Sequence, residues 1–376
     1  MGVNIYWLIV AAVIILGFIM PQYGSNKKYY IFLMTGLQVF VCGFRYMFLT
    51  GDLMKYNTIY QELRLHGWFS DYTWAEGRNT GFQWIMKLVS QLTDGDFQVF
   101  LFLLAVFTQV TFAVLVYKYS PQPWLSYLVW NCMAFFVTYD FTSIKQGMAM
   151  AVLMYSMICI FENRPMLFLL SVLLAGFIHM PALCFLPAYW IIKCRVNLTT
   201  IFVYIAASGV IFLLRNRIID FVTDLYYEGN DEIDFIMTSN SPGGRFAVIL
   251  LLAVTGLLIK GFRGKYFEGL FHIIIIAAIF QMFSSYNNVF TRLSDYYLQF
   301  AVLFIPMIFY DFDKAVPVNK NAWKPVLAFN RRSMRMLVIL LSVILIWWYD
   351  FTCLGVDGIS SVDDYTNYRF MWEVEQ

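Results

Sequence analysis

Charged side chains are scarce in this sequence. They make up 13% of its 376 residues, while hydrophobic residues make up 60%. Typical soluble domains carry about 25% charged residues, so the composition excludes an ordinary soluble fold. Several apolar runs approach the roughly 20 residues that a helix needs to cross a bilayer. The sequence therefore predicts an all-α polytopic membrane protein.

Cysteine and histidine are also sparse. The six cysteines stand singly, and there are three histidines, which excludes a disulfide framework and a histidine-rich metal site. The sequence shows no low-complexity tract and no long internal repeat. We expect no metal, no cofactor and no nucleic-acid partner.

The apolar runs predict about ten full membrane spans within a single transmembrane domain, residues 1–376. Each run carries few charges over a length close to one crossing. The predicted spans are residues 3–20, 29–49, 97–117, 124–141, 145–162, 199–214, 244–262, 267–284, 293–310 and 336–352.

A longer apolar run, residues 166–192, contains His179 and two prolines. Its length fits either one tilted helix or two short ones. The positive-inside rule favours two half-helices, 166–178 and 180–192. With that topology, fifteen of the 26 basic residues but only four of the 24 acidic ones fall on the cytoplasmic side. We therefore predict a re-entrant helix pair with His179 near its apex.

The same topology predicts that both termini are extracytoplasmic. It gives two long outer loops, residues 50–96 and 215–243, and a basic cytoplasmic loop, residues 311–335. Within the first outer loop, residues 80–93 are amphipathic, which favours a helix that lies in the membrane interface.

Cationic side chains gather at the predicted outer face, where the positive-inside rule predicts few. They are Arg45, Lys145, Arg215, Arg217, Arg245 and Arg292, and His179 approaches the same depth from the other side. An arginine offers a planar, permanently charged fork that binds two phosphate oxygens at once. The cluster predicts a site for an anionic group such as the diphosphate of a polyprenyl-linked glycan, whose lipid tail would lie in the bilayer.

Several of these residues have a structural alternative. Arginines can extend to lipid headgroups, and Arg292 can pair with Asp295 on the same helix face. His179 can cap a helix break, and Asp52 can cap a helix in the outer loop. The Asp-Gly-Asp stretch at 94–96 is typical of a turn, with a metal-binding pair as the alternative. The sequence leaves these alternatives open.

Four motifs, taken in order, resemble those of the EpsG family, relatives of the Wzy-type polysaccharide polymerases. The motifs extend over residues 40–310, most of the chain. They are FRYMFLTGDLMKY, IKQGMAMAVL, GFIHMPALCFLP and TRLSDYYLQF, with GFQWIMKLV between the first two. The sequence departs from the family pattern at Lys145, where arginine is usual, and at Gly51, which directly precedes Asp52 instead of standing one residue further back.

The resemblance implies a C-type membrane glycosyltransferase-like fold and an enzyme that joins polyprenyl-diphosphate-linked repeat units outside the membrane. It implies a bacterial cytoplasmic membrane, a lipid-linked glycan donor and acceptor as partners, and contact with assembly proteins such as a flippase or a chain-length regulator. By the same resemblance, family motif positions are held by Arg45, Asp52, Tyr56, Lys145, Gln146, His179 and Arg292.

Glycosyl transfer from a diphosphate requires stabilisation of the leaving group and removal of a proton from the acceptor hydroxyl. Fixed cations would do the first, and His179 or Asp52 would do the second as general base. Direct displacement would invert the anomeric centre without a metal. The expected diphosphate-binding residues are Arg45, Lys145, Arg245 and Arg292. The expected glycan-binding residues are Tyr56, Tyr60, Glu76, Gln146, Asp295 and Tyr296.

Three other functions share some of these features. A ligase would use the same donor with a different acceptor, and only the family resemblance separates it from a polymerase. A flippase or transporter of lipid-linked sugars would distribute polar residues through the membrane depth, and many transporters show an internal repeat. A membrane O-acyltransferase would also use a histidine inside the membrane, but it would not need several outward arginines.

Overall fold

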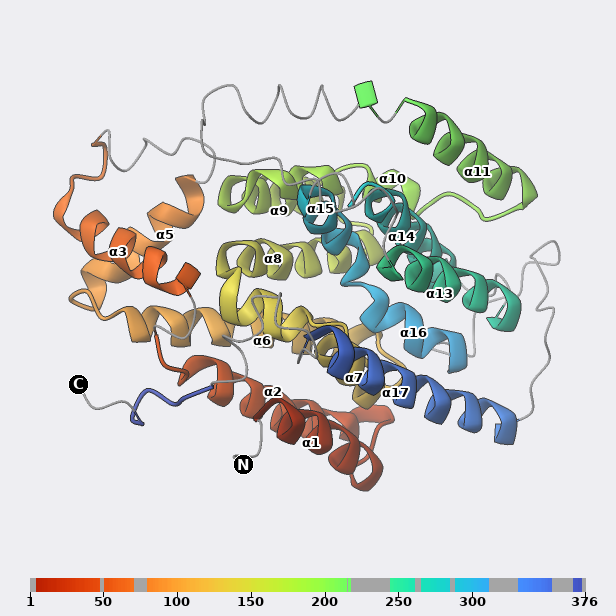
Figure 1. Ribbon diagram of the computed structural model, residues 1–376, viewed down its shortest axis with the longest axis horizontal. Helices are drawn as coiled ribbons and strands as arrows, with labels where there is room; N and C mark the ends of the chain where they lie inside the picture. Colours follow the sequence, from red (N-terminus) through yellow and green to blue (C-terminus); the bar gives the residue numbers. More distant parts are fainter. Residues whose placement is uncertain are drawn as a thin grey trace. The chain divides into compact units, whose positions relative to one another are not determined.

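The computed structural model contains helices and connecting loops, and no β-strand, over the residues that it describes (Figure 1). Those residues are 5–47, 51–70, 80–214, 216–217, 244–260, 265–284, 288–310, 331–353 and 368–373. The predicted all-α class is confirmed. The chain divides into two compact units: unit 1 comprises residues 1–186, 305–312 and 330–376, and unit 2 comprises residues 187–304 and 313–329.

Unit 1 is built on four helices that lie side by side in the order α2, α6, α8 and α9 (Figure 1). Helices α1 and α17 pack on α7, and α3 packs on α5, which also contacts α9. The elements of unit 1 are α1 (Ile5–Ile19), η1 (Gly24–Asn26), α2 (Lys27–Gly43), α3 (Gly51–Leu65), α5 (Thr80–Leu92), α6 (Phe97–Tyr119), α7 (Pro123–Cys132), η2 (Phe136–Thr142), α8 (Ile144–Phe161), α9 (Pro165–Ile178), η3 (Met180–Phe185) and α17 (Arg331–Cys353).

Polar contacts mark the two ends of this helix layer. At one end, Lys27 Nζ donates to the Ser120 carbonyl at 3.1 Å, and Lys118 Nζ donates to Glu162 Oε1 at 2.6 Å. Helix α2 therefore begins where α6 and α8 end. At the opposite end, α2 ends beside the start of α6. The four residues of the first end are all expected on the cytoplasmic side, and their contacts show that they share one end of unit 1. Which side of the membrane this end faces stays a prediction.

Helix α9 ends at Ile178, directly before the histidine at which the sequence predicts a break. His179 has extended backbone angles. Pro181 lacks an N–H group and its ring obstructs a continuing α-helix, so the chain proceeds as the short 3₁₀ helix η3, which packs back on α9. The break at His179 is confirmed. The prediction of one continuous half-helix over residues 180–192 is wrong, because this segment consists of η3 and the separate four-residue helix Ala188–Ile191.

The predicted span 124–141 is not one continuous helix. Helix α7 ends at Cys132, and Ala134 adopts a left-handed φ of 65°, which an α-helix of L-residues does not accommodate. The chain then forms the π-helix η2. Such π-helical turns are rare and frequently mark functional sites. The predicted span 293–310 is likewise divided, between Leu298 and Ala301.

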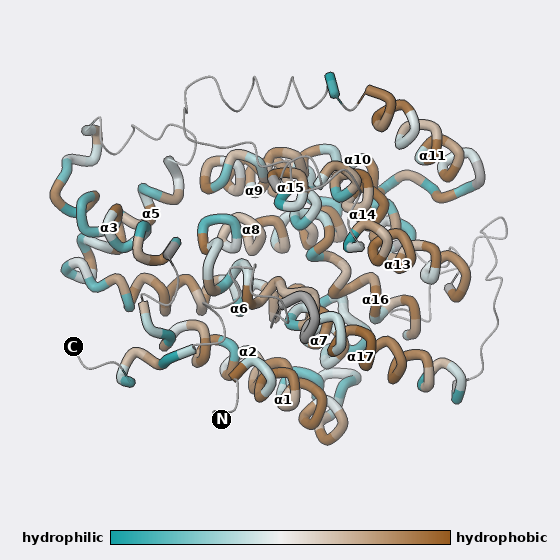
Figure 2. The backbone as a smooth tube through the Cα atoms, viewed as in Figure 1, coloured by the Kyte–Doolittle hydropathy of each residue, from teal (hydrophilic) through white to brown (hydrophobic). Residues whose placement is uncertain are grey.

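Within the described residues, α6 and α8 are long and apolar enough to cross a membrane by length and composition, and other apolar helices are shorter. Figure 2 shows hydrophobic residues along α1 and α17. Large apolar side chains of these helices are exposed, among them Phe18, Ile19 and Leu340. Exposed apolar faces of this kind are typical of contact with lipid or with another protein. The helices fit a membrane protein, while the number of ten spans stays a prediction.

Unit 2 is organised around α14, on which α10, α13 and α15 pack. His272 of α14 is buried: its Nε2 lies 3.0 Å from the Cys194 carbonyl oxygen, and its Nδ1 is hydrogen-bonded to the Tyr204 hydroxyl. This histidine therefore links three segments of the unit. The elements are α10 (Ala188–Ile191), α11 (Leu198–Leu213), α13 (Gly244–Lys260), α14 (Lys265–Gln281) and α15 (Asn288–Leu298); α16 (Ala301–Phe309) begins in unit 2 and continues into unit 1.

Gly147, near the start of α8, permits close packing against η2. A Cβ atom at this position would lie 2.2 Å from the Tyr139 carbonyl oxygen. We expect Gly147→Ala to lower the midpoint of thermal unfolding by several degrees, because the clash is with backbone that cannot move aside easily. Gly36→Ala in α2 is the control, since nothing lies within 4 Å of its added Cβ. Equal midpoints for the two variants would contradict this packing.

Candidate functional site

Arg45 lies just beyond the end of α2 and is buried, with 1% of its surface exposed. Its Nη1 donates to the Cys42 carbonyl oxygen and lies 3.0 Å from the Cys42 thiol. Its guanidinium lies 5.1 Å from the centre of the Phe141 ring, a cation–π contact. Among the described residues, its Nε and Nη2 have no hydrogen-bond partner. Buried donors are normally satisfied, so this arginine is a candidate for binding an anion.

A carboxylate lies in the same buried cluster. Asp140 of η2 is 4% exposed, and its Oδ2 accepts a hydrogen bond from Gln109 Nε2 of α6 at 2.6 Å. The Cys42 thiol donates to the Asp140 carbonyl oxygen at 3.2 Å, which ties η2 to α2. The charges of Asp140 and Arg45 attract each other, but the two described side chains do not form an ion pair within 4.0 Å.

The C-terminal segment, residues 368–373, lies against the backbone of Arg45. An antiparallel bridge joins Arg45 to Phe370, with backbone hydrogen bonds of 2.9 and 3.0 Å on its two sides. The Tyr368 hydroxyl donates to the Val41 carbonyl oxygen at 2.8 Å, across 327 positions of sequence. Distant parts of the chain therefore hold the backbone of Arg45 in place.

The end of unit 1 that holds Arg45 also holds other predicted site residues. Lys145 and Gln146 lie in the first turn of α8, directly after η2, and His179 follows the end of α9. Gln146 and His179 are buried. The start of α5 packs closely on α9: a Cβ atom on Gly81 would lie 2.4 Å from a ring carbon of Phe177 in α9. The helix directions thus bring Arg45, Lys145, Gln146 and His179 to one end of unit 1.

Asp52, Tyr56 and Tyr60 follow one another at intervals of four and therefore share one face of α3. Asp52 is exposed in the first turn. The ring of Tyr56 lies 5.5 Å from that of Phe82 in α5. Tyr60 is fully buried and packs α3 against the loop after α5. Sugar contact by these tyrosines stays a prediction, and Glu76 lies outside the described residues.

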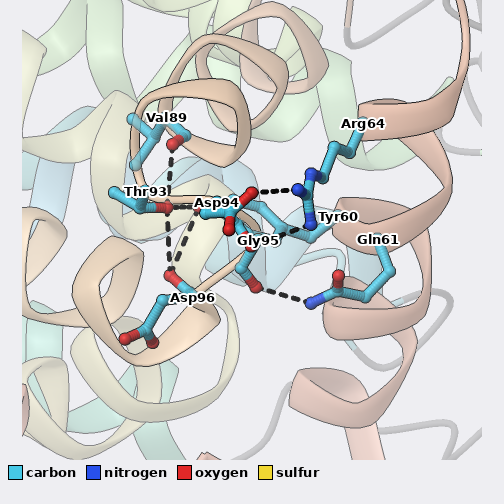
Figure 3. A network of polar contacts seen from close by, with 8 residues as sticks. All are labelled: Tyr60, Gln61, Arg64, Val89, Thr93, Asp94, Gly95 and Asp96. Carbon is cyan, nitrogen blue, oxygen red and sulfur yellow. Dashed lines mark hydrogen bonds and ion pairs between the residues drawn. The ribbon is translucent and has the colours of Figure 1, made fainter.

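The Asp-Gly-Asp stretch forms a turn that joins α5 to α6, as Figure 3 shows. Asp94 and Gly95 have left-handed φ values of 54° and 86°, and Arg64 of α3 pairs with the Asp94 carboxylate. Asp96 caps α6 by accepting hydrogen bonds from its first turn. The turn interpretation is confirmed. No group of three or more potential metal ligands occurs in the described part of the chain, and a metal-independent reaction stays a prediction.

Lys87 of α5 is a fully buried cation that caps the end of α3. Its Nζ donates to the Leu63 carbonyl at 2.8 Å and to the His66 carbonyl, and lies 5.2 Å from the centre of the Trp68 ring. A cation at a helix C-terminus interacts favourably with the helix dipole. Burial lowers the pKa of Lys87. Lys87 therefore links α5 to the end of α3. The location of α5 in the membrane interface stays a prediction.

In unit 2, Arg245 of α13 forms an ion pair with Asp295 of α15. Arg245 Nη2 pairs with Asp295 Oδ1, and Nη1 lies 3.4 Å from Oδ2. The carboxylate already neutralises this arginine, which makes it a weaker anion site than Arg45. Arg292 is exposed and Tyr296 is fully buried. Arg45 belongs to unit 1 and these residues belong to unit 2, and their common role in diphosphate binding stays a prediction.

Sequence reasoning missed Asp140 and Gln109. The available signal was a single carboxylate in the apolar stretch 124–141, since an ionisable residue within a membrane segment is costly and usually functional. Gln109 carried no comparable signal, because its role depends on the position of η2 beside α6.

Apolar helices around an internal polar cluster define the class of the protein as a membrane protein with a buried polar site. The EpsG family model matches residues 28–320, and the chain belongs to the EpsG family, a family of Wzy-like polymerases. The family indicates a polymerase-type role in exopolysaccharide biosynthesis. No curated protein and no solved structure matches the chain.

We expect Lys87→Met to destabilise unit 1, because methionine fills similar space but leaves the two carbonyls at the end of α3 without their donor. The loss should be about 1–3 kcal/mol in the free energy of unfolding. Lys55→Met, at an exposed position of α3, is the control and should lower the free energy of unfolding by less than about 0.5 kcal/mol. Denaturant unfolding of both purified variants measures the difference; equal losses would refute the capping role.

Proposed function

We propose that this protein polymerises polyprenyl-diphosphate-linked oligosaccharide repeat units at the outer face of a bacterial cytoplasmic membrane. The family membership supports the polymerase-type role. The single observation that carries the chemical part is Arg45, a buried cation with two donors that no described residue satisfies. A diphosphate supplies the acceptor oxygens and the negative charge that such a group lacks.

Arg45 would bind the diphosphate of the donor and stabilise the charge that develops on it as the glycosidic bond breaks. Lys145 lies at the same end of unit 1 and is the second cation proposed for this role. Because only 1% of Arg45 is exposed, a ligand reaches it only when covering groups move. The C-terminal segment 368–373 lies directly against the backbone of Arg45.

The acceptor hydroxyl needs a base as it attacks the anomeric carbon. His179 fits this role, because an unperturbed imidazole exchanges protons near neutral pH and it lies at the Arg45 end of unit 1. Asp52, in the first turn of α3, is the alternative base. Attack on the face opposite the diphosphate forms the new glycosidic bond, releases the polyprenyl diphosphate, and inverts the anomeric centre without a metal.

The proposed reaction takes place with the polyprenyl tails in the bilayer and the sugars in the outer loops. The predicted topology, with both termini extracytoplasmic, would place Arg45 and His179 toward the outer surface. The residues proposed to contact sugars are Tyr56, Tyr60, Glu76, Gln146, Asp295 and Tyr296, and Arg245 and Arg292 are proposed as further diphosphate-binding residues. A flippase would deliver the repeat unit, and a chain-length regulator would act on the product.

The test is polymerisation of synthetic polyprenyl-diphosphate repeat units by the full-length protein in lipid vesicles. We expect Arg45→Ala to reduce the rate by about 100-fold or more, and Arg45→Lys to restore part of it, because lysine keeps the charge but not the fork. His179→Gln should cost about 10²–10⁴-fold if His179 is the base. Arg64→Ala removes an exposed arginine of the same unit and should leave the rate unchanged.

Each result separates the rival functions. Normal polymer from folded Arg45→Ala protein would remove Arg45 from the site. Transfer of the glycan to another acceptor without chain growth would identify a ligase, and movement of the lipid-linked unit across the vesicle without bond formation would identify a flippase. Retention of the anomeric configuration in the polymer would contradict direct displacement.

A further inference from the structure

The buried cluster in unit 1 contains a cation, Arg45, with donors that no described residue satisfies, and a carboxylate, Asp140, with polar side chains beside it. Arg45 makes its hydrogen bonds through Nη1 alone, to the carbonyl and thiol of Cys42. Asp140 accepts through Oδ2 from Gln109. The two charges attract each other, yet no ion pair within 4.0 Å joins these two described side chains. Unpaired charges in a dry interior are costly.

Separate contacts hold the two charges in place. Asp140 belongs to η2, whose position is secured by Gly147 packing against the Tyr139 carbonyl and by the hydrogen bond from Gln109. The backbone of Arg45 is held by its bridge to Phe370. The side chains can therefore influence each other without direct contact. In a low-dielectric interior, such an influence remains strong over several ångströms.

We propose that Asp140 is a positioning residue that sets the affinity of Arg45 for the diphosphate, by acting as its counter-charge while the site is empty. This inference rests on the proposed function. In the empty protein, Asp140 offsets part of the cost of the buried guanidinium. When a diphosphate binds, Arg45 interacts with the diphosphate instead of with Asp140. The negative charges of Asp140 and the diphosphate then repel each other, so Asp140 lowers the affinity for the diphosphate. For a polymerase this favours release of the polyprenyl diphosphate after each transfer.

The side chains around Arg45 and Asp140 are mostly neutral, which makes Asp140 the candidate counter-charge. Thr108, Gln109 and Trp130 beside the carboxylate are neutral. Cys42 joins the two residues as a thiol, hydrogen-bonded to Arg45 and to the Asp140 backbone. Tyr368 of the C-terminal segment is a neutral phenol bonded to the α2 backbone. The Asp140 carboxylate acts electrostatically on both Cys42 and the arginine, whereas Glu373 of the C-terminal segment acts on Tyr368.

The experiment measures binding of inorganic pyrophosphate to the purified full-length protein by calorimetry, together with the midpoint of thermal unfolding. We expect Asp140→Asn, which keeps the shape and an acceptor for Gln109, to bind pyrophosphate about tenfold more tightly than wild type while unfolding at a lower temperature when empty. Asp140→Glu keeps the charge and should bind no more tightly than wild type. Asp94→Asn is the control: it removes an exposed carboxylate of the same unit and should leave the affinity unchanged.

A double-mutant cycle keeps the test informative if Asp140→Asn is too unstable to assay. Arg45→Gln combined with Asp140→Asn removes both charges, and we expect it to be more stable than Asp140→Asn alone. A residue that only fills space would lower stability without tightening binding, and its loss would not be rescued by Arg45→Gln. Either of those results would overturn the role of Asp140.

The outcomes also separate this inference from the proposed function. If wild type binds pyrophosphate, Arg45→Gln weakens binding, and Asp140→Asn leaves it unchanged, the diphosphate site stands and the role of Asp140 is refuted. If wild type does not bind pyrophosphate, or Arg45→Gln binds as tightly as wild type, the proposed diphosphate site and this inference fail together.

Discussion

The buried charge of Arg45 is the constraint on which the organisation of unit 1 depends. A guanidinium that has lost its water must be offset by carbonyl groups, by an aromatic face and by an opposite charge. The end of α2 supplies the carbonyl of Cys42, while η2 supplies the Phe141 ring and the carboxylate of Asp140. The C-terminal segment then fixes the backbone on which the arginine stands. Three distant parts of the chain converge because one cation has to be accommodated.

Interrupted helices make this convergence possible. The break between α7 and η2 turns Asp140 inward, and the break at His179 returns the chain against α9. In a membrane, backbone that leaves the regular helix is tolerated only where protein or a polar cavity surrounds it. Buried side chains flank both breaks, among them Phe135 at the first and Ile178 and Ala182 at the second. Irregular backbone thus occurs in unit 1 where polar side chains have to be presented to the interior.

Charged side chains also stabilise the ends of other helices of unit 1. Lys87 satisfies the end of α3, and Asp96 satisfies the start of α6. Each is a charged side chain placed at the helix terminus whose partial charge it complements. Lys87 joins α5 to α3, and Gln61 of α3 donates to the Gly95 carbonyl in the turn that leads into α6. Helices α3 and α5 are thereby attached to the helix layer of unit 1.

Composition and hydrophobic run length alone determined the all-α class, and Pro181 beside His179 determined the helix break, because these depend on local chemistry. The family was recognisable from short motifs in their order along the chain. The sequence could not reveal that span 124–141 breaks at Ala134, that Arg245 pairs with Asp295, or that Asp140 approaches Arg45. The last two features depend on pairs of residues that are 50 and 95 positions apart, which no local pattern encodes. Tertiary packing decides which buried charges have partners, because only packing determines how near two side chains lie and how much water is left between them.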